Sequence, residues 1–167
     1  MRNAYTIIFR WNTAVWAITL GSIALGVALL VVAGRCLFAL HEVAIGLGLL
    51  IVSAMLFAVI VVAEGYAPQR LEVGDDGIVI LRRYRSVKIP RDRIVSVERV
   101  PAKSVMQSFR LGGSGGLFGF FGLRYSRGIG RFNLYATEFR NMVMICTAHK
   151  TFIVSCAEPE HLLGRFS

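Results

Sequence analysis

The sequence predicts a two-helix transmembrane hairpin followed by an all-β domain with a short C-terminal helix. Two long uncharged segments lie near the N-terminus, at residues 13–34 and 43–63. The rest of the chain carries short alternating and β-branched runs separated by turn residues. Only 17% of the residues are charged, whereas soluble domains carry about a quarter. A mean hydropathy of +0.60 with a net charge of +9 indicates a membrane protein with a basic aqueous part.

Each uncharged segment is long enough to cross a bilayer. At roughly 1.5 Å per residue, either would form a helix of about 30 Å, which matches the hydrocarbon thickness. Both segments are apolar on every side, which is not the pattern of a helix on the surface of a soluble domain. The first segment is too long for a cleaved signal peptide, and the second follows after only a short loop.

The two segments contain no ionisable side chain. A transporter, proton relay or ion channel normally needs one, so the hairpin is interpreted as an anchor. Ser22 and Gly26 are four residues apart, as are Ala44 and Gly48. Small residues at this spacing permit close helix contact, although such residues are also common in membrane helices in general.

The flanking positive charges predict the orientation. Basic residues lie before the first segment and after the second, whereas the loop at residues 35–42 has one Arg and one Glu. The positive-inside rule therefore predicts a multi-pass protein with both termini in the cytoplasm. The charges that decide this are Arg2, Arg10, Arg70, Arg82, Arg83 and Arg85.

The aqueous part has the pattern of a small β-domain. Strands are predicted at residues 70–73, 78–83, 86–89, 94–100, 131–137, 142–147 and 151–156. Residues 102–130 are expected to be irregular, and Glu158-Pro159-Glu160 opens a short helix. The pattern predicts a small, partly closed barrel or sandwich. The chain is thus divided into residues 1–66, the tail and hairpin, and residues 67–167, the β-domain.

Several short motifs are similar to those of a known family. They are FRLGGSGGLFGFFG at residues 109–122, NLYAT at 133–137, NMVMICT at 141–147 and FIVS at 152–155. Together with the element order, they resemble a membrane-anchored bacterial pleckstrin-homology (PH) domain family with a Gly/Phe-rich insertion. The resemblance covers residues 64–165. It implies a PH-like barrel, the bacterial inner membrane and a role in membrane-associated assembly, and it supplies no catalytic residues.

The glycine-rich segment has two interpretations. It is not a phosphate-binding loop, because it lacks both Gly-Lys-Ser/Thr and a GxGxxG register. In the first interpretation, Phe118, Phe120 and Phe121 insert into a bilayer or a partner, while Arg110 and Arg124 meet lipid phosphates. In the second, the phenylalanines cover an open end of the barrel and the glycines only allow the turns.

A basic run begins at the end of the second predicted strand. Its first members are Arg82, Arg83, Arg85 and Lys88, and it continues to Arg93. Beside a membrane anchor it would attract anionic lipid, or it forms a solvated sheet face with no special partner. The acidic turn Asp75-Asp76 argues against a specific phosphoinositide site. The lack of an aromatic ladder argues against nucleic acid.

The remaining polar residues indicate no catalysis. None of the three histidines has metal-ligand spacing with the three cysteines, and no cofactor motif is present. We therefore expect a non-catalytic, membrane-anchored binding or scaffold protein that presents its PH-like domain to protein or anionic-lipid partners, with self-association expected. The alternative is an accessory subunit of a membrane enzyme or transporter that handles an anionic substrate. The expected contact residues are Arg82, Arg83, Arg85, Lys88, Arg110, Phe118, Phe120, Phe121 and Arg124.

Overall fold

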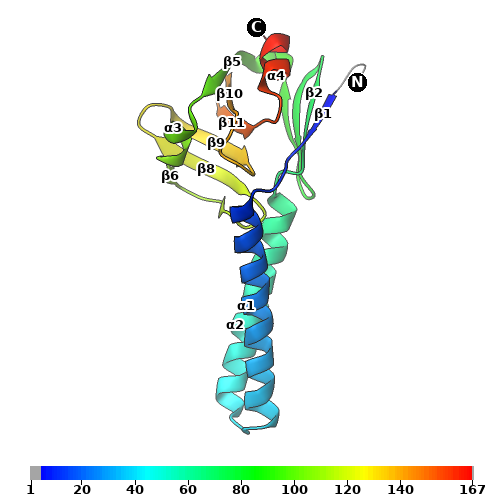
Figure 1. The fold of residues 1–167 in the computed structure, drawn as a ribbon, viewed down its shortest axis with the longest axis vertical. Helices are drawn as coiled ribbons and strands as arrows, with labels where there is room; N and C mark the ends of the chain where they lie inside the picture. Colours follow the sequence, from blue (N-terminus) through cyan, green and yellow to red (C-terminus); the bar gives the residue numbers. More distant parts are fainter. Residues whose placement is uncertain (1–4, 167) are drawn as a thin grey trace.

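A computed structural model describes residues 5–166, as a β-rich domain mounted on a helical hairpin (Figure 1). The hairpin consists of α1 (Thr13–Phe38) and α2 (Val43–Tyr66). Both helices are long and apolar enough to cross a membrane. The side chain of Asn12 begins α1 by accepting a hydrogen bond from the Val15 amide at 2.9 Å.

Small residues do bring the helices together, but not all of those predicted. The Ser53 hydroxyl of α2 donates to the Gly26 carbonyl of α1 at 3.0 Å, and Gly46 is buried against α1. Of the two interpretations given for Ala44 and Gly48, close helix contact is not found, since both residues are exposed. The contact face of α2 instead repeats after seven residues, which is two helical turns.

The first sheet is antiparallel and has the order β1-β2-β3-β4. Its strands are β1 (Tyr5–Ile8), β2 (Arg70–Gly74), β3 (Gly77–Leu81) and β4 (Val87–Pro90). The hairpin is therefore inserted between two neighbouring strands, because β1 precedes α1 and β2 follows α2. We did not predict β1, which adds residues 5–8 to the sheet.

The second sheet has the order β5-β10-β11-β9-β8-β6, and β7 also pairs with β8. The β11–β9 pair is parallel, and the other pairs are antiparallel. The strands are β5 (Ile94–Val100), β6 (Phe109–Arg110), β7 (Ser114–Gly115), β8 (Phe120–Ser126), β9 (Gly130–Ala136), β10 (Met142–Thr147) and β11 (Thr151–Ser155). Short helices complete the domain: η1 (Arg91–Arg93), α3 (Ala102–Met106) and α4 (Pro159–Phe166).

The two sheets share one core, and a second core lies on the outer face of the second sheet. Ile80 of β3, Ile145 of β10 and Leu162 of α4 are fully buried in the first core. Val105 of α3 and Leu134 of β9 are fully buried in the second. The two faces of β9 line different cores, because Leu134 lies in the second core and Tyr135 in the first.

The predicted barrel does not close. Strands β4 and β5 share no hydrogen-bond ladder, so the sheets remain two layers. The cause lies between them: Pro90 has no N–H to donate, and η1 turns the chain before Ile94 begins β5. The sandwich with a short C-terminal helix that we considered beside the barrel is the arrangement found.

The other strands lie close to their predicted positions, except in one segment. Residues 102–130 are not irregular, since they contain α3, β6, β7 and all of β8. Strand β8 escapes detection because Gly122 and the polar residues of FFGLRYS interrupt its apolar pattern.

Strand β1 provides a direct test of the first sheet. Ile7 is 7% exposed and Ile8 is 62% exposed, because alternate side chains point to opposite faces. We expect Ile7→Ala to lower the free energy of unfolding by about 2–5 kcal/mol and Ile8→Ala to have almost no effect. Thermal unfolding of the full chain in mild detergent measures both. Equal stability of the two variants would show that β1 is not part of the folded domain.

Candidate functional site

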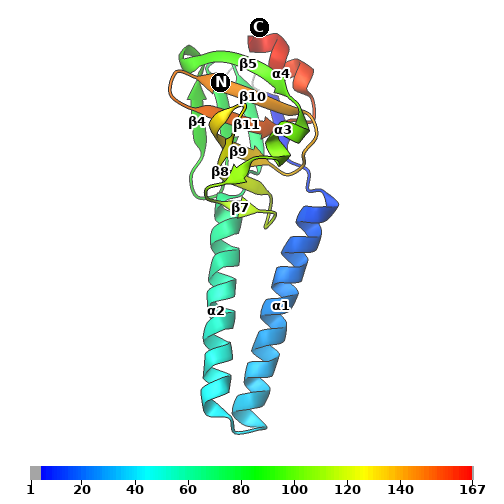
Figure 2. The same cartoon turned by 90° about the vertical axis from the view of Figure 1, so that its left-hand side faces the viewer.

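The most distinctive surface lies where the hairpin meets the domain. There, residues 111–119, here called the glycine loop, lie between α1 and α2 (Figure 2). The Phe118 amide donates to the Thr19 hydroxyl of α1 at 3.1 Å. The Phe118 ring meets the Trp11 ring edge-to-face, with 5.7 Å between centroids. Gly116 packs against the Ile18 side chain. The loop thus contacts α1 well inside its apolar segment.

Glycine lets this loop lie flat on strand β8. Gly113 has a φ of +104° and Gly122 a φ of +123°, a region that other residues rarely adopt. A Cβ at Gly113 would overlap the Phe121 carbonyl oxygen, and one at Gly122 would overlap the Gly112 carbonyl oxygen. The Ser114 hydroxyl then closes the turn by donating to the Leu117 carbonyl at 2.8 Å.

The turn between β3 and β4, residues 82–86, contacts the end of α2. Arg83 forms an ion pair with Glu64, with 2.7 Å between Nη1 and Oε2. The Tyr84 amide donates to the Gly65 carbonyl at 3.0 Å, and the Tyr84 ring occupies the space that a Cβ at Gly65 would need. Both helices are therefore attached to the domain by contacts as well as by the chain.

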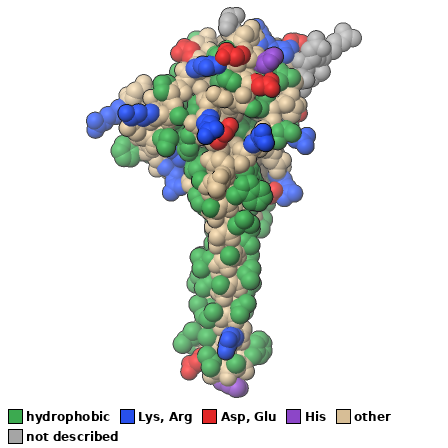
Figure 3. Space-filling view, viewed as in Figure 1, with side chains coloured by type: hydrophobic (Ala, Val, Ile, Leu, Met, Phe, Trp, Pro, Cys, Tyr) green, Lys and Arg blue, Asp and Glu red, His purple; other side chains and the backbone are tan. Residues whose placement is uncertain are grey.

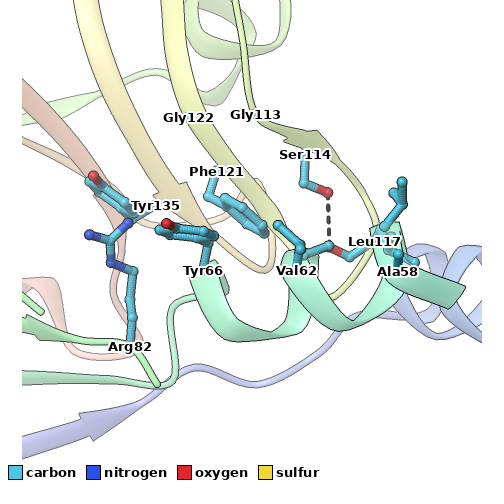
Figure 4. A pocket seen from close by; sticks show the side chains of 12 residues that line it. Ala58, Val62, Tyr66, Arg82, Gly113, Ser114, Leu117, Phe121, Gly122 and Tyr135 are labelled. Carbon is cyan, nitrogen blue, oxygen red and sulfur yellow. Dashed lines mark hydrogen bonds between the residues drawn. The ribbon is translucent and has the colours of Figure 1, made fainter. Parts of the chain in front are cut away.

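A cavity of about 560 Å³ lies between α2, the glycine loop and the second sheet. Its α2 wall is apolar, and Figure 4 shows Arg82, Tyr66 and Tyr135 gathered at the opposite end. The lining residues are Ala58, Val59, Val62, Ala63, Tyr66, Arg82, Gly113, Ser114, Leu117, Phe121, Gly122 and Tyr135.

The polar end of this cavity is built around Arg82. Its guanidinium carbon lies 5.7 Å from the Tyr66 ring centroid and 5.4 Å from that of Tyr135. Its Nε donates to the Arg85 carbonyl at 2.6 Å. Burial raises the pKa of Tyr135, and the Arg82 charge partly offsets this effect. The Tyr135 hydroxyl is therefore a neutral donor near pH 7, and the cavity combines an apolar wall with one cationic end.

A second groove, of about 620 Å³, opens between β4 and the turn joining β10 to β11. Lys88, Arg93, His149 and Lys150 line it, with Asp92 as the acidic residue in the lining. This groove can accept an anionic group from solvent.

The structure divides the predicted basic run among these features. Arg82 lines the cavity, Arg83 pairs with Glu64, Arg85 is exposed and Lys88 lines the second groove. The members of the run therefore have different surroundings, and a contact role for each member stays a prediction. Tyr66 and Tyr135 were not among the predicted contact residues. In the sequence, the one signal for Tyr66 was an aromatic side chain just after the second apolar segment.

The three predicted phenylalanines pack against other parts of the protein. Phe121 is 7% exposed in the first core, Phe118 packs on Trp11, and Phe120 packs on Phe139 with 4.6 Å between ring centroids. Each ring therefore packs on other side chains of the protein, and contact of these phenylalanines with a bilayer or a partner stays a prediction.

The two arginines predicted beside these rings differ in exposure. Arg110 is exposed, whereas Arg124 is 8% exposed and its Nη1 donates to the Ser108 hydroxyl at 3.3 Å. Burial, and then the neighbouring Arg110 charge, lower the pKa of Arg124. Little of Arg124 is left to meet a ligand, and contact of either arginine with lipid phosphate stays a prediction.

Residues 5–166 contain no group of three His, Cys, Asp or Glu side chains placed to hold a metal ion. The cysteines are free, and Cys36 and Cys156 are buried.

Comparison with known proteins identifies a family. A family model described as a bacterial PH domain matches residues 69–166, which is more than half of the chain. The matched region begins just after α2 and ends in α4, so it covers both sheets apart from β1. No match to the chain was found among curated proteins or among solved structures.

Two adjacent glycines test the docking of the loop on β8. Gly113→Ala should lower the free energy of unfolding by about 1–3 kcal/mol, because its φ is positive and the added Cβ overlaps backbone. Gly112→Ala is the matched control, since nothing lies within 4 Å of its Cβ position. Thermal unfolding of both variants decides the matter. The assigned loop conformation would be refuted if Gly113→Ala were as stable as Gly112→Ala.

Proposed function

Because the chain belongs to the bacterial PH domain family, we propose that it is a non-catalytic, membrane-anchored binding protein. The hairpin spans the bacterial inner membrane, and both termini and the PH domain lie in the cytoplasm. The domain uses the second groove, here called the basic groove, to bind an acidic segment of a protein partner. This partner can be a second copy of the same chain.

The surface of the hairpin supports the anchor. Figure 3 shows a largely apolar shaft, with charged side chains at its tip and on the domain. Leu25 is 55% exposed on α1, and Ile51 is 59% exposed on α2. Exposing so large an apolar surface to water costs free energy, whereas contact with lipid tails does not. The basic flanks at Arg10 and Arg70 support the cytoplasmic orientation.

The observation that carries the proposal is the fixed mounting of the domain. The hairpin leaves from β1 and returns directly into β2, and these strands are paired with each other. The Phe118–Thr19 hydrogen bond and the Arg83–Glu64 ion pair add contacts to both helices. A domain held in this way presents its surfaces at a constant height and angle above the bilayer, which suits a scaffold.

The groove supports an acidic partner. Its lining contains three cationic side chains, Lys88, Arg93 and Lys150, and one carboxylate, that of Asp92. Strand β4 is also an edge of the first sheet, so its outer backbone groups are available to an added extended segment. Attraction between exposed charges decays over a Debye length of about 8 Å at physiological ionic strength, so this contact should weaken as salt rises.

Reporter fusions test the topology. A fluorescent protein fused to the C-terminus should be fluorescent in cells, and alkaline phosphatase fused there should be inactive. Phosphatase inserted in the loop between α1 and α2, at residues 39–42, should be active because that loop would lie in the periplasm. The reverse pattern of phosphatase activity would overturn the proposed orientation.

Charge reversal tests the groove. We expect the full chain, extracted in mild detergent, to migrate on native gels as a complex larger than the monomer. Lys88→Glu with Lys150→Glu should dissociate this complex, as should high salt. Lys103→Glu with Arg140→Glu is the control, since it changes the net charge equally at exposed sites outside the groove. A monomeric wild type, or equal behaviour of the two double variants, would contradict the proposed binding surface.

A further inference from the structure

We propose that the cavity between α2 and the glycine loop binds one anionic phospholipid of the cytoplasmic leaflet. The phosphate of the headgroup lies at Arg82, and an acyl chain lies along α2. This inference rests on the membrane anchoring proposed above but not on the protein partner, and it concerns a different surface from the basic groove.

The polarity of the cavity changes along the helix axis. Ala58, Val59 and Val62 form its apolar wall, whereas Tyr66 stands at the polar end beside Arg82 (Figure 4). Residues 58 and 66 are separated by about 12 Å of helix, at roughly 1.5 Å per residue. In a membrane-spanning helix this axis runs close to the bilayer normal, so the gradient has the same direction as that of a lipid molecule.

The cavity is also open to the surroundings of α2. Val59 is 58% exposed, Val62 is 53% exposed and Tyr66 is 42% exposed. Val62 lies in the uncharged segment that ends at residue 63, which places this opening at the depth of acyl chains. A lipid can therefore enter sideways from its leaflet. The polar end reaches the edge of the hydrocarbon, where phosphate groups lie.

The charge at the polar end selects an anion. Within residues 5–166, Arg82 donates a hydrogen bond through Nε to the Arg85 carbonyl. None of the residues that line the cavity carries a carboxylate. The two terminal NH₂ groups of Arg82 are left without a protein acceptor in that part of the chain. A guanidinium presents a planar fork that matches phosphate oxygens. Neighbouring Arg83 differs, because Glu64 neutralises it.

The volume agrees with a lipid headgroup and part of a chain. Small-molecule sites measure about 300–1,000 Å³ and combine an apolar lining with a few placed polar groups. At about 560 Å³, this cavity falls within that range. The lining residues show the same division, with the apolar side chains Leu117 and Phe121 at one end and the Tyr135 ring beside Arg82 at the other.

Native mass spectrometry of the full chain provides the test. The protein is released from nanodiscs of equal phosphatidylglycerol and phosphatidylethanolamine content, and the retained lipids are counted. We expect one retained phosphatidylglycerol. Arg82→Gln should reduce the preference for this anionic lipid by about tenfold, because a charge-assisted hydrogen bond is lost. Arg83→Gln removes one charge from the same turn but outside the cavity lining, and it should keep the preference.

A second pair of variants tests the apolar wall. Val62→Phe places a ring in the cavity and should reduce retention of both lipids. Val61→Phe is the matched control, because Val61 is 56% exposed on the same helix and does not line the cavity. Both changes keep an apolar side chain on a face exposed to lipid, so the fold should hold in each.

Three results would overturn this inference. They are equal lipid preference in Arg82→Gln and Arg83→Gln, unchanged retention in Val62→Phe, and displacement of the retained lipid by inorganic phosphate. The last result would show a site for a free anion rather than for a lipid. The proposed binding of a protein partner fails by a different readout, the loss of the larger complex on native gels, so the two failures are distinguishable.

Discussion

The pairing of β1 with β2 is the constraint on which the rest of the molecule depends. Ile8 lies opposite Arg70, and the Phe9 amide donates to the Gln69 carbonyl at 3.3 Å. Once these strands are paired, the chain must leave the sheet and return to it at the same edge. Two antiparallel helices satisfy this requirement in the shortest way. Hairpin and domain are therefore one structure, and the hairpin cannot swing on a linker.

This constraint also accounts for the cavity. The helices touch near their tip at Gly46 and near their middle at the Ser53–Gly26 hydrogen bond, and they diverge towards the domain (Figure 2). The glycine loop occupies the space that opens between them. Its glycines let the loop approach β8 and the helices, but they supply no side chains to fill the remaining volume. Space is left on the α2 side, where Leu117 is the large apolar side chain of the loop that lines the cavity.

Local patterns in the sequence were enough to predict the two long apolar helices, most strands and the short C-terminal helix. The failures have specific physical causes. Tyr5–Ile8 precedes an apolar segment and belongs to a sheet whose other strands follow it by more than sixty residues, so no local signal marks it. Closure of the barrel depended on whether β4 pairs with β5. The cavity joins Tyr66, Arg82 and Tyr135 from three elements, and only the tertiary fold brings these side chains together.

The basic run shows how the fold changes the meaning of a sequence pattern. In the sequence, Arg82, Arg83 and Lys88 look equivalent, because all are cations near an anchor. The β3–β4 turn separates them: Arg83 meets Glu64 at the end of α2, and Lys88 lies in the groove beyond it. Arg82 is the cation held between two aromatic rings at the junction. Since the turn is bonded to α2 through Gly65, the height of this guanidinium above the helix end is fixed by the fold, whatever surrounds the domain.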